Sequence, residues 1–362
     1  MRKLNPQNER LKRTYCRFLR QAKGKSEHTA DAARKALDRY ELYTGARGFE
    51  SFNREQAIGF KDRLASTNRI GTQEQLSHST QTATLAALKE FFAWLAWQPG
   101  YKSKIHVPDI EYLNPSRKDT AIAKAAKLRD FPSLEQIRAA ISAMPSDSVV
   151  ARRNRALIAF GILTGIRDRA MASLSLQHLD PLKSPPVVRQ EPDRVATKFS
   201  KAIVTYFFPL GDDLASIVCE WVSELRLVHL FGPNDPIFPR TKVIHGNNRE
   251  FHAAGIEPWH WSDAAPIRSI FRDAFLAANL PYYPPHTFRH SLVHLMQSLP
   301  LTPEQIKAWS QNLGHESVGT TLTAYGRIDP HRQGEVIRSI SIDPSEPSEQ
   351  VLAKIRALLN QP

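Results

Sequence analysis

The feature that most constrains the fold of this chain is the helical periodicity of apolar residues over its first hundred positions. Four segments place apolar side chains on one helical face and polar or basic side chains on the other. These apolar faces are marked by Leu11 and Tyr15, Ala33 and Leu37, Ala57 and Phe60, and Leu85, Leu88 and Phe92. Asn53 precedes the third segment with Gln56 three positions on, which is capping-box spacing. Four such helices with short connections predict a compact bundle whose aromatic side chains form the core.

The periodic pattern ends near Pro99, and a charged stretch broken by prolines follows it. Regular structure resumes at Ser133, a favourable N-cap before an apolar segment. We therefore predict an N-terminal helical domain over residues 1–112, a linker over 113–130, a second domain over 131–340 and a tail over 341–362. The tail repeats apolar residues at helical spacing, so we expect a helix that packs on its own domain or on a neighbouring subunit.

The second domain is predicted to be mainly helical, with one β-prone region between Pro185 and Leu210. Three short runs there suggest a small antiparallel sheet: 187–188, 194–197 and 203–208. Helices are expected to resume near Asp212, Asp263 and His286. The predicted fold class is mainly α, with a four-helix bundle followed by a mostly helical domain that contains this sheet.

The charge of the chain indicates a polyanionic partner. Its 362 residues carry a formal net charge of +13, and Glu9 is the one acidic residue among the first 25. No run of apolar residues is long enough to cross a membrane, and the N-terminus lacks the apolar region of a secretory signal. Cys16 and Cys219 form neither a disulfide framework nor a metal-binding pattern, as expected in a reducing cytoplasm.

Three short segments carry residue types suited to handling a phosphodiester. In Leu-Thr-Gly-Ile-Arg, a glycine precedes Arg167 at the start of a helix. In His-Thr-Phe-Arg-His, His286 and Arg289 are three positions apart and so project from one helical face. Leu-Gly-His ends at His315, and Tyr325 follows ten residues later. Each segment alone is unremarkable, but their order along the chain, with a lysine-bearing hairpin between the first two, is rare.

This arrangement resembles the tyrosine recombinase, or phage integrase, family. The resemblance implies an active site of Arg167, Arg289, His286, His315 and the nucleophile Tyr325, together with a hairpin lysine, and His290 as a possible supporting residue. The first domain then resembles the core-binding, SAM-like domain, and the second resembles the catalytic domain. The implied protein is a site-specific recombinase that cleaves and rejoins double-stranded DNA as a tetramer on paired sites, at the bacterial nucleoid.

The chemistry of strand cleavage accounts for each residue type. Paired guanidinium groups neutralise the non-bridging phosphate oxygens and the charge of the transition state, which we assign to Arg167 and Arg289. The tyrosine must lose its proton to attack, and His286 is the candidate base. His315 is expected to donate a hydrogen bond to the phosphate. The product is a covalent 3′-phosphotyrosyl intermediate, which conserves the bond energy for rejoining.

The leaving 5′-oxygen needs a proton, which the family takes from the hairpin lysine. Lys201 lies eight residues before Pro209 and matches the family's register without a gap. Lys198 opens Lys-Phe-Ser-Lys, which resembles the family's turn, and remains the alternative. No metal or other cofactor is expected, since the chain has no carboxylate cluster at ligand spacing and no phosphate-binding GxxxxGK[ST] loop.

The sequence departs from the family pattern at two positions. The family commonly has an acidic residue three positions after the first arginine, where it orients the histidines, and this chain has Ala170. Asp168 is the nearest substitute. The step from His315 to Tyr325 is one residue longer than usual. These departures support a second hypothesis, a DNA-binding architectural or regulatory protein of the same fold with impaired catalysis. A related topoisomerase, which relaxes supercoils without strand exchange, is a third.

Overall fold

The computed structural model describes residues 5–68, 75–124, 130–195, 201–245, 251–324 and 333. The chain divides into two compact units, residues 1–125 and 126–362. Tyr325, Lys198 and the predicted tail helix lie outside the described residues. Within the described residues, no helix is both long and apolar enough to span a membrane.

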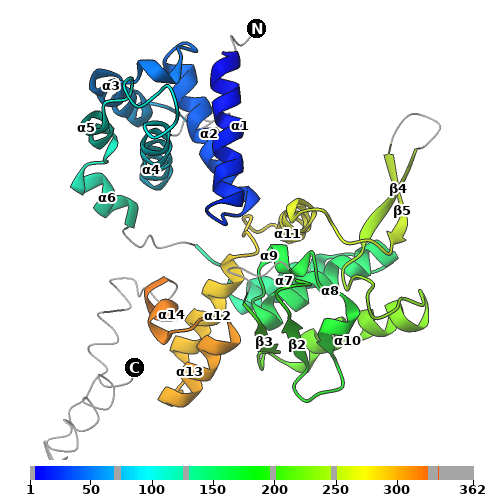
Figure 1. Ribbon diagram of the computed structural model, residues 1–362. Coiled ribbons are helices and arrows are strands. Elements are labelled where there is room, and N and C mark those ends of the chain that lie inside the picture. The colour runs from blue at the N-terminus through cyan, green and yellow to red at the C-terminus, as the bar shows by residue number, and fades with distance from the viewer. Residues whose placement is uncertain are drawn as a thin grey trace, which may run out of the picture. The chain divides into compact units, whose positions relative to one another are not determined.

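Unit 1 is a helical bundle, as the sequence predicts (Figure 1). Its principal helices are α1 (Pro6–Gln21), α2 (Glu27–Tyr43), α3 (Arg54–Ala65) and α4 (His78–Leu95), with a short 3-10 turn η1 (Phe49–Ser51) before α3. Each principal helix begins at a residue whose side chain accepts a backbone N–H of the first turn, namely Asn5, Ser26, Asn53 and Ser77. The helix starts therefore follow directly from local capping chemistry.

The core of unit 1 is aromatic. Tyr40 is 1% exposed and packs edge-on against Phe60 and Phe92, and Phe92 stacks on Phe52 at 3.9 Å between ring centroids. Edge-to-face and offset contacts of this kind add to the stabilisation from burying the rings. The prediction that these aromatic side chains form the core is confirmed.

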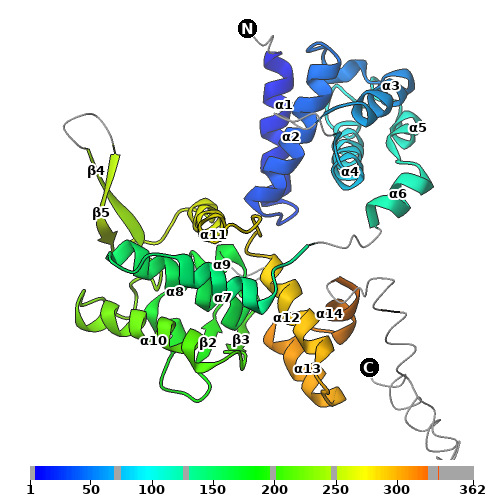
Figure 2. The same cartoon turned by 180° about the vertical axis from the view of Figure 1, so that it is seen from behind.

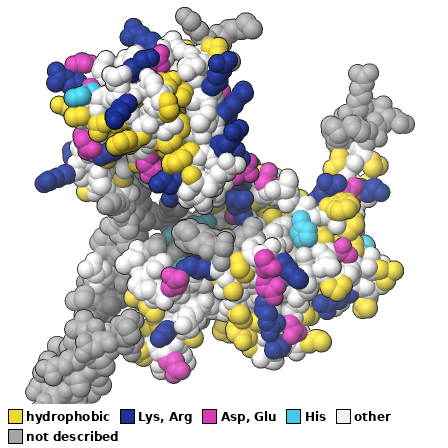
Figure 3. All heavy atoms as spheres, viewed as in Figure 1, with side chains coloured by type: hydrophobic (Ala, Val, Ile, Leu, Met, Phe, Trp, Pro, Cys, Tyr) yellow, Lys and Arg dark blue, Asp and Glu magenta, His cyan; other side chains and the backbone are white. Residues whose placement is uncertain are grey.

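The outward face of α1 is basic. Four arginines on this helix are exposed: Arg10, Arg13, Arg17 and Arg20. Figure 3 shows Lys and Arg side chains gathered along the edge of unit 1 that α1 forms. A groove of about 370 Å³ between α1 and α2 has Arg13, Arg17 and Arg34 in its lining. The excess positive charge of the N-terminal segment is thus presented together on one surface.

The predicted linker, residues 113–130, contains regular structure. A short helix α5 (Val107–Ile110) and a 3-10 turn η2 (Glu111–Leu113) lead into it, and helix α6 (Arg117–Lys124) within it packs on α4. Ser116 explains α6, because its Oγ accepts the backbone N–H of Asp119 and caps the first turn. The Asp119 carboxylate in turn pairs with His78 at the start of α4. The charged, proline-rich composition that suggested a linker belongs here to a short capped helix.

Unit 2 is built around α8 (Val149–Thr164). Its residues from Ala156 to Thr164 are all buried, and α8 runs side by side with α10 (Asp212–Leu227) in both views (Figures 1 and 2). An apolar helix of this kind becomes buried all round and organises the elements that cover it. The other helices are α7 (Leu134–Ala143), α9 (Asp168–Met171), α11 (Ala265–Ala277), α12 (Thr287–Ser298), α13 (Pro303–Asn312) and α14 (Val318–Ala324). The predicted helix starts near residues 212, 263 and 286 lie within two residues of the observed ones.

A small antiparallel sheet lies in unit 2; two of its strands fall in the predicted region, 185–210, and the first, β1, precedes that region and was not predicted. Its strands are β1 (Leu179–Asp180), β2 (Val187–Gln190) and β3 (Ile203–Tyr206), in the order β1-β2-β3. Val188 pairs with Thr205 in the β2–β3 register. The middle predicted run, 194–197, is not a strand where it is described, because Arg194 and Val195 turn back through hydrogen bonds to the Glu191 carbonyl. A 3-10 turn η3 (Leu176–His178) precedes β1.

Unit 2 also contains a two-stranded hairpin that was not predicted from the sequence. Strands β4 (Arg240–His245) and β5 (Phe251–Glu257) pair antiparallel and extend away from the helices of unit 2 in both views (Figures 1 and 2). Val243 and Ile244 on this hairpin are about half exposed. Its alternation of apolar and polar residues is too short and irregular to separate from a loop by sequence alone.

Candidate active site

Arg289 is the best-fixed charged residue of unit 2. It lies on the first turn of α12 and is 3% exposed. Nη1 donates to the Gly165 carbonyl at 2.7 Å, and Nη2 donates to the Leu313 carbonyl at 2.5 Å. Nη2 also lies 2.7 Å from Nε2 of His315. One guanidinium therefore joins the three sequence segments singled out for phosphodiester chemistry.

Gly165 allows this junction to form. It ends α8 in the left-handed conformation, with φ +59°, which glycine adopts without strain. A Cβ atom at this position would lie 2.8 Å from Leu313 and 2.9 Å from Leu292. Because the glycine lets these side chains approach, its carbonyl can face the Arg289 guanidinium. Position 165 in the Leu-Thr-Gly-Ile-Arg segment thus requires glycine both for its backbone conformation and for lack of space for a side chain.

The protonation of His315 follows from its neighbours. Every guanidinium nitrogen carries hydrogen and none can accept, so Nε2 of His315 must accept from Arg289. The ring proton is then on Nδ1, which donates to the Thr321 hydroxyl at 2.7 Å. Burial, together with the positive charges of Arg289, Arg167 and His286, lowers the pKa of His315 to about 4. His315 is therefore neutral near pH 7, and it faces Arg289 as an acceptor.

The described hydrogen bonds of His315 differ from those expected of a residue that donates to the phosphate. A hydrogen bond from His315 to a phosphate would require a proton on Nε2, and here that atom accepts from Arg289. In the described conformation, His315 orients the guanidinium instead.

Arg167 differs from Arg289 in being partly exposed. It is the N-cap residue of α9, and its guanidinium makes no hydrogen bond or ion pair within the described part of the chain. Its charge nevertheless acts on His315, which places it near the Arg289–His315 pair. The first arginine is thus available to an incoming anion, whereas the second is built into the protein.

The acidic position that the family commonly uses has no carboxylate here. Ala170 is 2% exposed, and its methyl group belongs to the apolar core of unit 2. Asp168, the nearest substitute, has its carboxylate bound by Nε and Nη2 of Arg268, both at 2.8 Å. Asp168 is therefore committed to α11 and does not orient the histidines.

His286 and His290 lie one turn apart at the start of α12. His286 is the N-cap residue and is exposed, whereas His290 is 7% exposed, and their rings meet edge-on at 5.7 Å. Phe131 stacks on His290, with ring planes 10° apart. An exposed imidazole supported by a buried one is suited to exchanging protons with a bound molecule.

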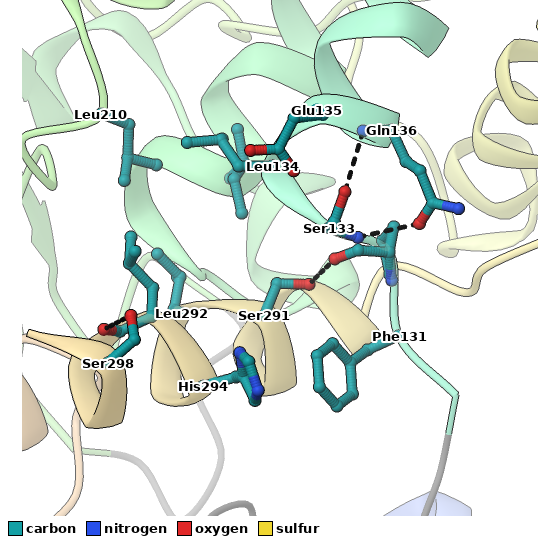
Figure 4. A pocket seen from close by; sticks show the side chains of 13 residues that line it. Phe131, Ser133, Leu134, Glu135, Gln136, Leu210, Ser291, Leu292, His294 and Ser298 are labelled. Carbon is teal, nitrogen blue, oxygen red and sulfur yellow. Dashed lines mark hydrogen bonds between the residues drawn. The ribbon is translucent and has the colours of Figure 1, made fainter. Parts of the chain in front are cut away.

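The chain entering unit 2 is fastened to the same helix. Ser291 on α12 donates to the Pro132 carbonyl at 2.5 Å, and Phe131 also contacts His294 (Figure 4). Ser133 and Gln136 then close a capping box at the start of α7. A mostly apolar cavity of about 350 Å³ lies between these two helices. These contacts hold α12, and with it His286 and Arg289, against the beginning of the unit.

Lys201 lies beside His315. Both line a groove of about 500 Å³, together with Gly314 and Glu316. The Lys201 ammonium forms an ion pair with the Glu316 carboxylate. The strand that follows Lys201 is fixed in place, since Asn312 at the end of α13 exchanges two hydrogen bonds with the backbone of Tyr206. The hairpin lysine position is therefore held next to the Leu-Gly-His segment.

The candidate site offers the side-chain cations of Arg167, Arg289 and Lys201 for binding an oxyanion. The acidic side chains that could hold a metal ion gather elsewhere. In the described part of the chain, the one trio of acidic or metal-ligating side chains lies in unit 1: Glu9, Asp38 and Glu41. The Lys12 ammonium donates to all three carboxylates and already satisfies them. Burial would lower the pKa of Lys12, but these hydrogen bonds outweigh burial and raise it. The trio thus forms a buried ion-pair network rather than a cation site.

Sequence reasoning missed several residues that position the site. Thr321 and Ser310 support His315, Asn312 anchors β3, and Arg268 binds Asp168. Hydroxyl and amide residues are common at helix ends, so nothing in their spacing distinguished them. Their roles depend on contacts between α11, α13, α14 and the sheet, which only the folded chain creates.

The chain is similar in sequence to known proteins. Residues 13–99 match the phage integrase N-terminal SAM-like domain family. The chain is 25% identical over 318 residues to tyrosine recombinase XerC of Pseudomonas putida (strain W619), covering 86% of this chain and 90% of the relative.

Two solved structures share the fold. The XerH recombinase in a post-cleavage complex with difH substrate matches with a TM-score of 0.62 and 16% identity, over 92% of this chain and 84% of that one. A lambda integrase(75-356) dimer bound to a COC′ core site matches with a TM-score of 0.57 and 14% identity, over 92% and 99%.

Proposed function

We propose that this chain, which belongs to the tyrosine recombinase or phage integrase family, is a site-specific DNA recombinase. It cleaves and rejoins strands through a covalent 3′-phosphotyrosyl intermediate formed by Tyr325, without metal or ATP. The observation that carries the proposal is the guanidinium of Arg289, which brings together Gly165, Leu313 and His315 beside the open side chain of Arg167. Charge fixed in this way suits a phosphodiester, whose transition state gains negative charge.

The two arginines divide the work on the phosphate. Arg289 supplies charge whose position is set by the protein, so little reorganisation accompanies the reaction. Arg167 is partly exposed and has a fork of donors that fits two non-bridging oxygens. His315, neutral and hydrogen-bonded to Arg289, keeps that guanidinium oriented.

Proton transfer falls to His286 and a hairpin lysine. His286 is exposed at the start of α12, where an imidazole can take the proton of the attacking phenol. Lys201 is our candidate for protonating the 5′-oxygen, supported by its place in the groove beside His315. On cleavage, the ion pair with Glu316 would give way to the DNA backbone. Lys198 remains the alternative donor.

Duplex DNA is the proposed partner. The basic face of α1 and the net charge of +13 suit contacts to backbone phosphates. One structural relative is a lambda integrase tetramer bound to a Holliday junction, which supports assembly of four copies on two paired sites. The tail over 341–362 would then contact a neighbouring copy.

The test uses a nicked suicide duplex, in which the cut strand cannot be rejoined. Wild type should form a covalent protein–DNA adduct, whereas Tyr325→Phe should bind the same DNA and form none. Tyr206→Phe is the matched control, because this tyrosine is 48% exposed in the same unit and its adduct yield should equal that of wild type. Tight DNA binding by wild type with no adduct would contradict the proposal.

A second function has specific support. The buried Ala170 and the engagement of Asp168 by Arg268 leave the site without the family's orienting carboxylate. A DNA-binding architectural or regulatory protein with impaired catalysis would show the binding without the adduct. A topoisomerase would form the adduct and relax supercoiled DNA, but would not exchange strands between two sites.

A further inference from the structure

A chain of buried hydroxyl groups extends the active site toward α14. Ser310 Oγ lies 2.7 Å from Thr321 Oγ1, which lies 2.7 Å from Nδ1 of His315. His315 Nε2 then lies 2.7 Å from the Arg289 guanidinium. All four side chains are almost fully buried, with exposures of 1% for Ser310, 0% for Thr321, 7% for His315 and 3% for Arg289. Solvent therefore cannot replace any partner in this series.

The directions of the first two hydrogen bonds follow from the arginine. Because Arg289 can only donate, His315 must hold its proton on Nδ1 and donate to Thr321. The Thr321 oxygen accepts this hydrogen bond and shares another with the Ser310 hydroxyl, in which either oxygen can donate. The direction is therefore set from Arg289 through His315 to Thr321.

We propose that Thr321, supported by Ser310, is a positioning residue: its oxygen accepts the Nδ1–H of His315, holds the imidazole against Arg289 and thereby fixes the guanidinium. The catalytic consequence rests on the proposed recombinase function. In this chain His315 thus has a hydroxyl as its Nδ1 partner, while position 170 carries a buried alanine.

A hydroxyl and a carboxylate would orient the imidazole with different electrostatic results. A carboxylate would favour the charged imidazolium, which could no longer accept from Arg289. A neutral hydroxyl fixes the ring without that attraction, so the lone pair on Nε2 remains. This matches a site in which two arginines and His286 already disfavour a further positive charge on His315.

The same contact ties α14 to the site. Thr321 lies on α14 and Ser310 on α13, so their hydroxyl contact fastens the two helices together. The backbone N–H of His315 also donates to the Ser310 carbonyl at 3.1 Å. In sequence, α14 leads directly to Tyr325. Thr321 therefore couples the segment before the proposed nucleophile to the arginine that would hold the phosphate.

The first test reads the tautomer of His315 directly. Nitrogen-15 NMR of the histidine-labelled full chain, assigned with His315→Gln, should show a protonated Nδ1 and an unprotonated Nε2 in wild type. Thr321→Val, which is isosteric but lacks the hydroxyl, leaves the buried Nδ1–H without an acceptor, so the ring should turn away from Arg289 and lose this pattern. Thr321→Ser should keep it. An unchanged His315 tautomer in Thr321→Val would overturn the proposal.

The second test measures single-turnover adduct formation on the nicked duplex. Thr321→Val should lower the rate by about tenfold or more at unchanged DNA affinity, while Thr321→Ser should stay within about threefold of wild type. Ser310→Ala, which keeps the partner of His315, should give a smaller loss than Thr321→Val. Equal rates for Thr321→Val and wild type would refute the positioning role even if the tautomer changed.

The two tests separate the two proposals. If wild type forms no adduct, the recombinase function fails, but the NMR measurement still decides whether Thr321 holds His315 against Arg289. If wild type forms the adduct and Thr321→Val matches it in rate and tautomer, the function stands and the role of Thr321 is refuted. Should Thr321→Val not fold, Thr321→Ser and Ser310→Ala carry both measurements.

Discussion

Replacing Arg289 with lysine would keep the positive charge of this buried side chain but remove its planar fork of donors. The guanidinium reaches three acceptors, the carbonyls of Gly165 and Leu313 and the Nε2 atom of His315. A lysine ammonium at the same place is a single point and can reach one of them. The other two acceptors would then be buried without a donor.

The size of the effect follows from these lost contacts. A hydrogen bond to a charged group contributes about 1.5–3 kcal/mol, so losing two lowers the unfolding free energy of unit 2 by about 3–6 kcal/mol. Arg167→Lys is the matched control, because Arg167 has no partner among the described residues. It should change the unfolding free energy by less than about 0.5 kcal/mol. Both variants should lose adduct formation by about 100-fold or more, since both arginines would face the phosphate.

Urea unfolding, monitored by hydrogen exchange and mass spectrometry, can assign the destabilisation to unit 2. Adduct formation is measured on the nicked duplex. Two results would refute the reasoning. If Arg289→Lys unfolded at the same urea concentration as wild type, the guanidinium would not be anchored as described. If Arg167→Lys were equally destabilised, the two arginines would not differ in the way that their burial indicates.

Three further outcomes are expected. The pKa of His315 is about 4 in the folded chain and about 6.5 in the unfolded chain, so the unfolded state takes up the proton first as the pH falls. Wild type should therefore lose about 2 kcal/mol of unfolding free energy through His315 between pH 7 and pH 5, and His315→Gln should not show this loss. Lys12→Met leaves Glu41, 3% exposed, without its buried counter-charge and should destabilise unit 1 by about 3–5 kcal/mol in urea unfolding. Exchanging Arg13 and Arg17 together for glutamine should reduce the slope of log affinity for DNA against log salt by about 2.

Each of these outcomes has a control in the same chain. Burial also lowers the pKa of His178 and of His260, so the residual pH dependence of His315→Gln should remain. Arg34→Gln removes a half-exposed partner of the Lys12 network and should cost about 1 kcal/mol or less. Thr14→Ala on the exposed side of α1 should leave the salt slope unchanged. An unchanged slope in the double arginine variant would place the DNA contacts elsewhere.

Much of the fold could be predicted from local patterns. Apolar spacing and capping side chains such as Asn53 and Ser133 located the four principal helices of unit 1 and the starts of several helices of unit 2, because the first turn of a helix is satisfied by residues adjacent in sequence. The hairpin β4–β5 was not predicted, since no short-range sequence pattern indicates that its two strands pair. The cap of α6 at Ser116 was present in the sequence, but charge and prolines around it favoured a linker.

The candidate site was also only partly predictable from the sequence. Its residue types and their order could be recognised, since Arg167, His286, Arg289 and His315 lie in short, recognisable segments. The hydrogen-bond partners of these residues could not be predicted. Gly165 and Arg289 are 124 positions apart and meet only because α8 and α12 pack together.

By itself, the sequence determined where many of the principal helices begin, the basic surface of α1 and the set of residues available for phosphate chemistry, because each depends on neighbouring residues or on composition. The tertiary structure decided which arginine is built in and which is open, that Asp168 belongs to Arg268, and that His315 is neutral with its proton facing Thr321. These outcomes depend on burial and on hydrogen-bond direction. Both are properties of side chains brought together from distant segments, and no local pattern encodes them.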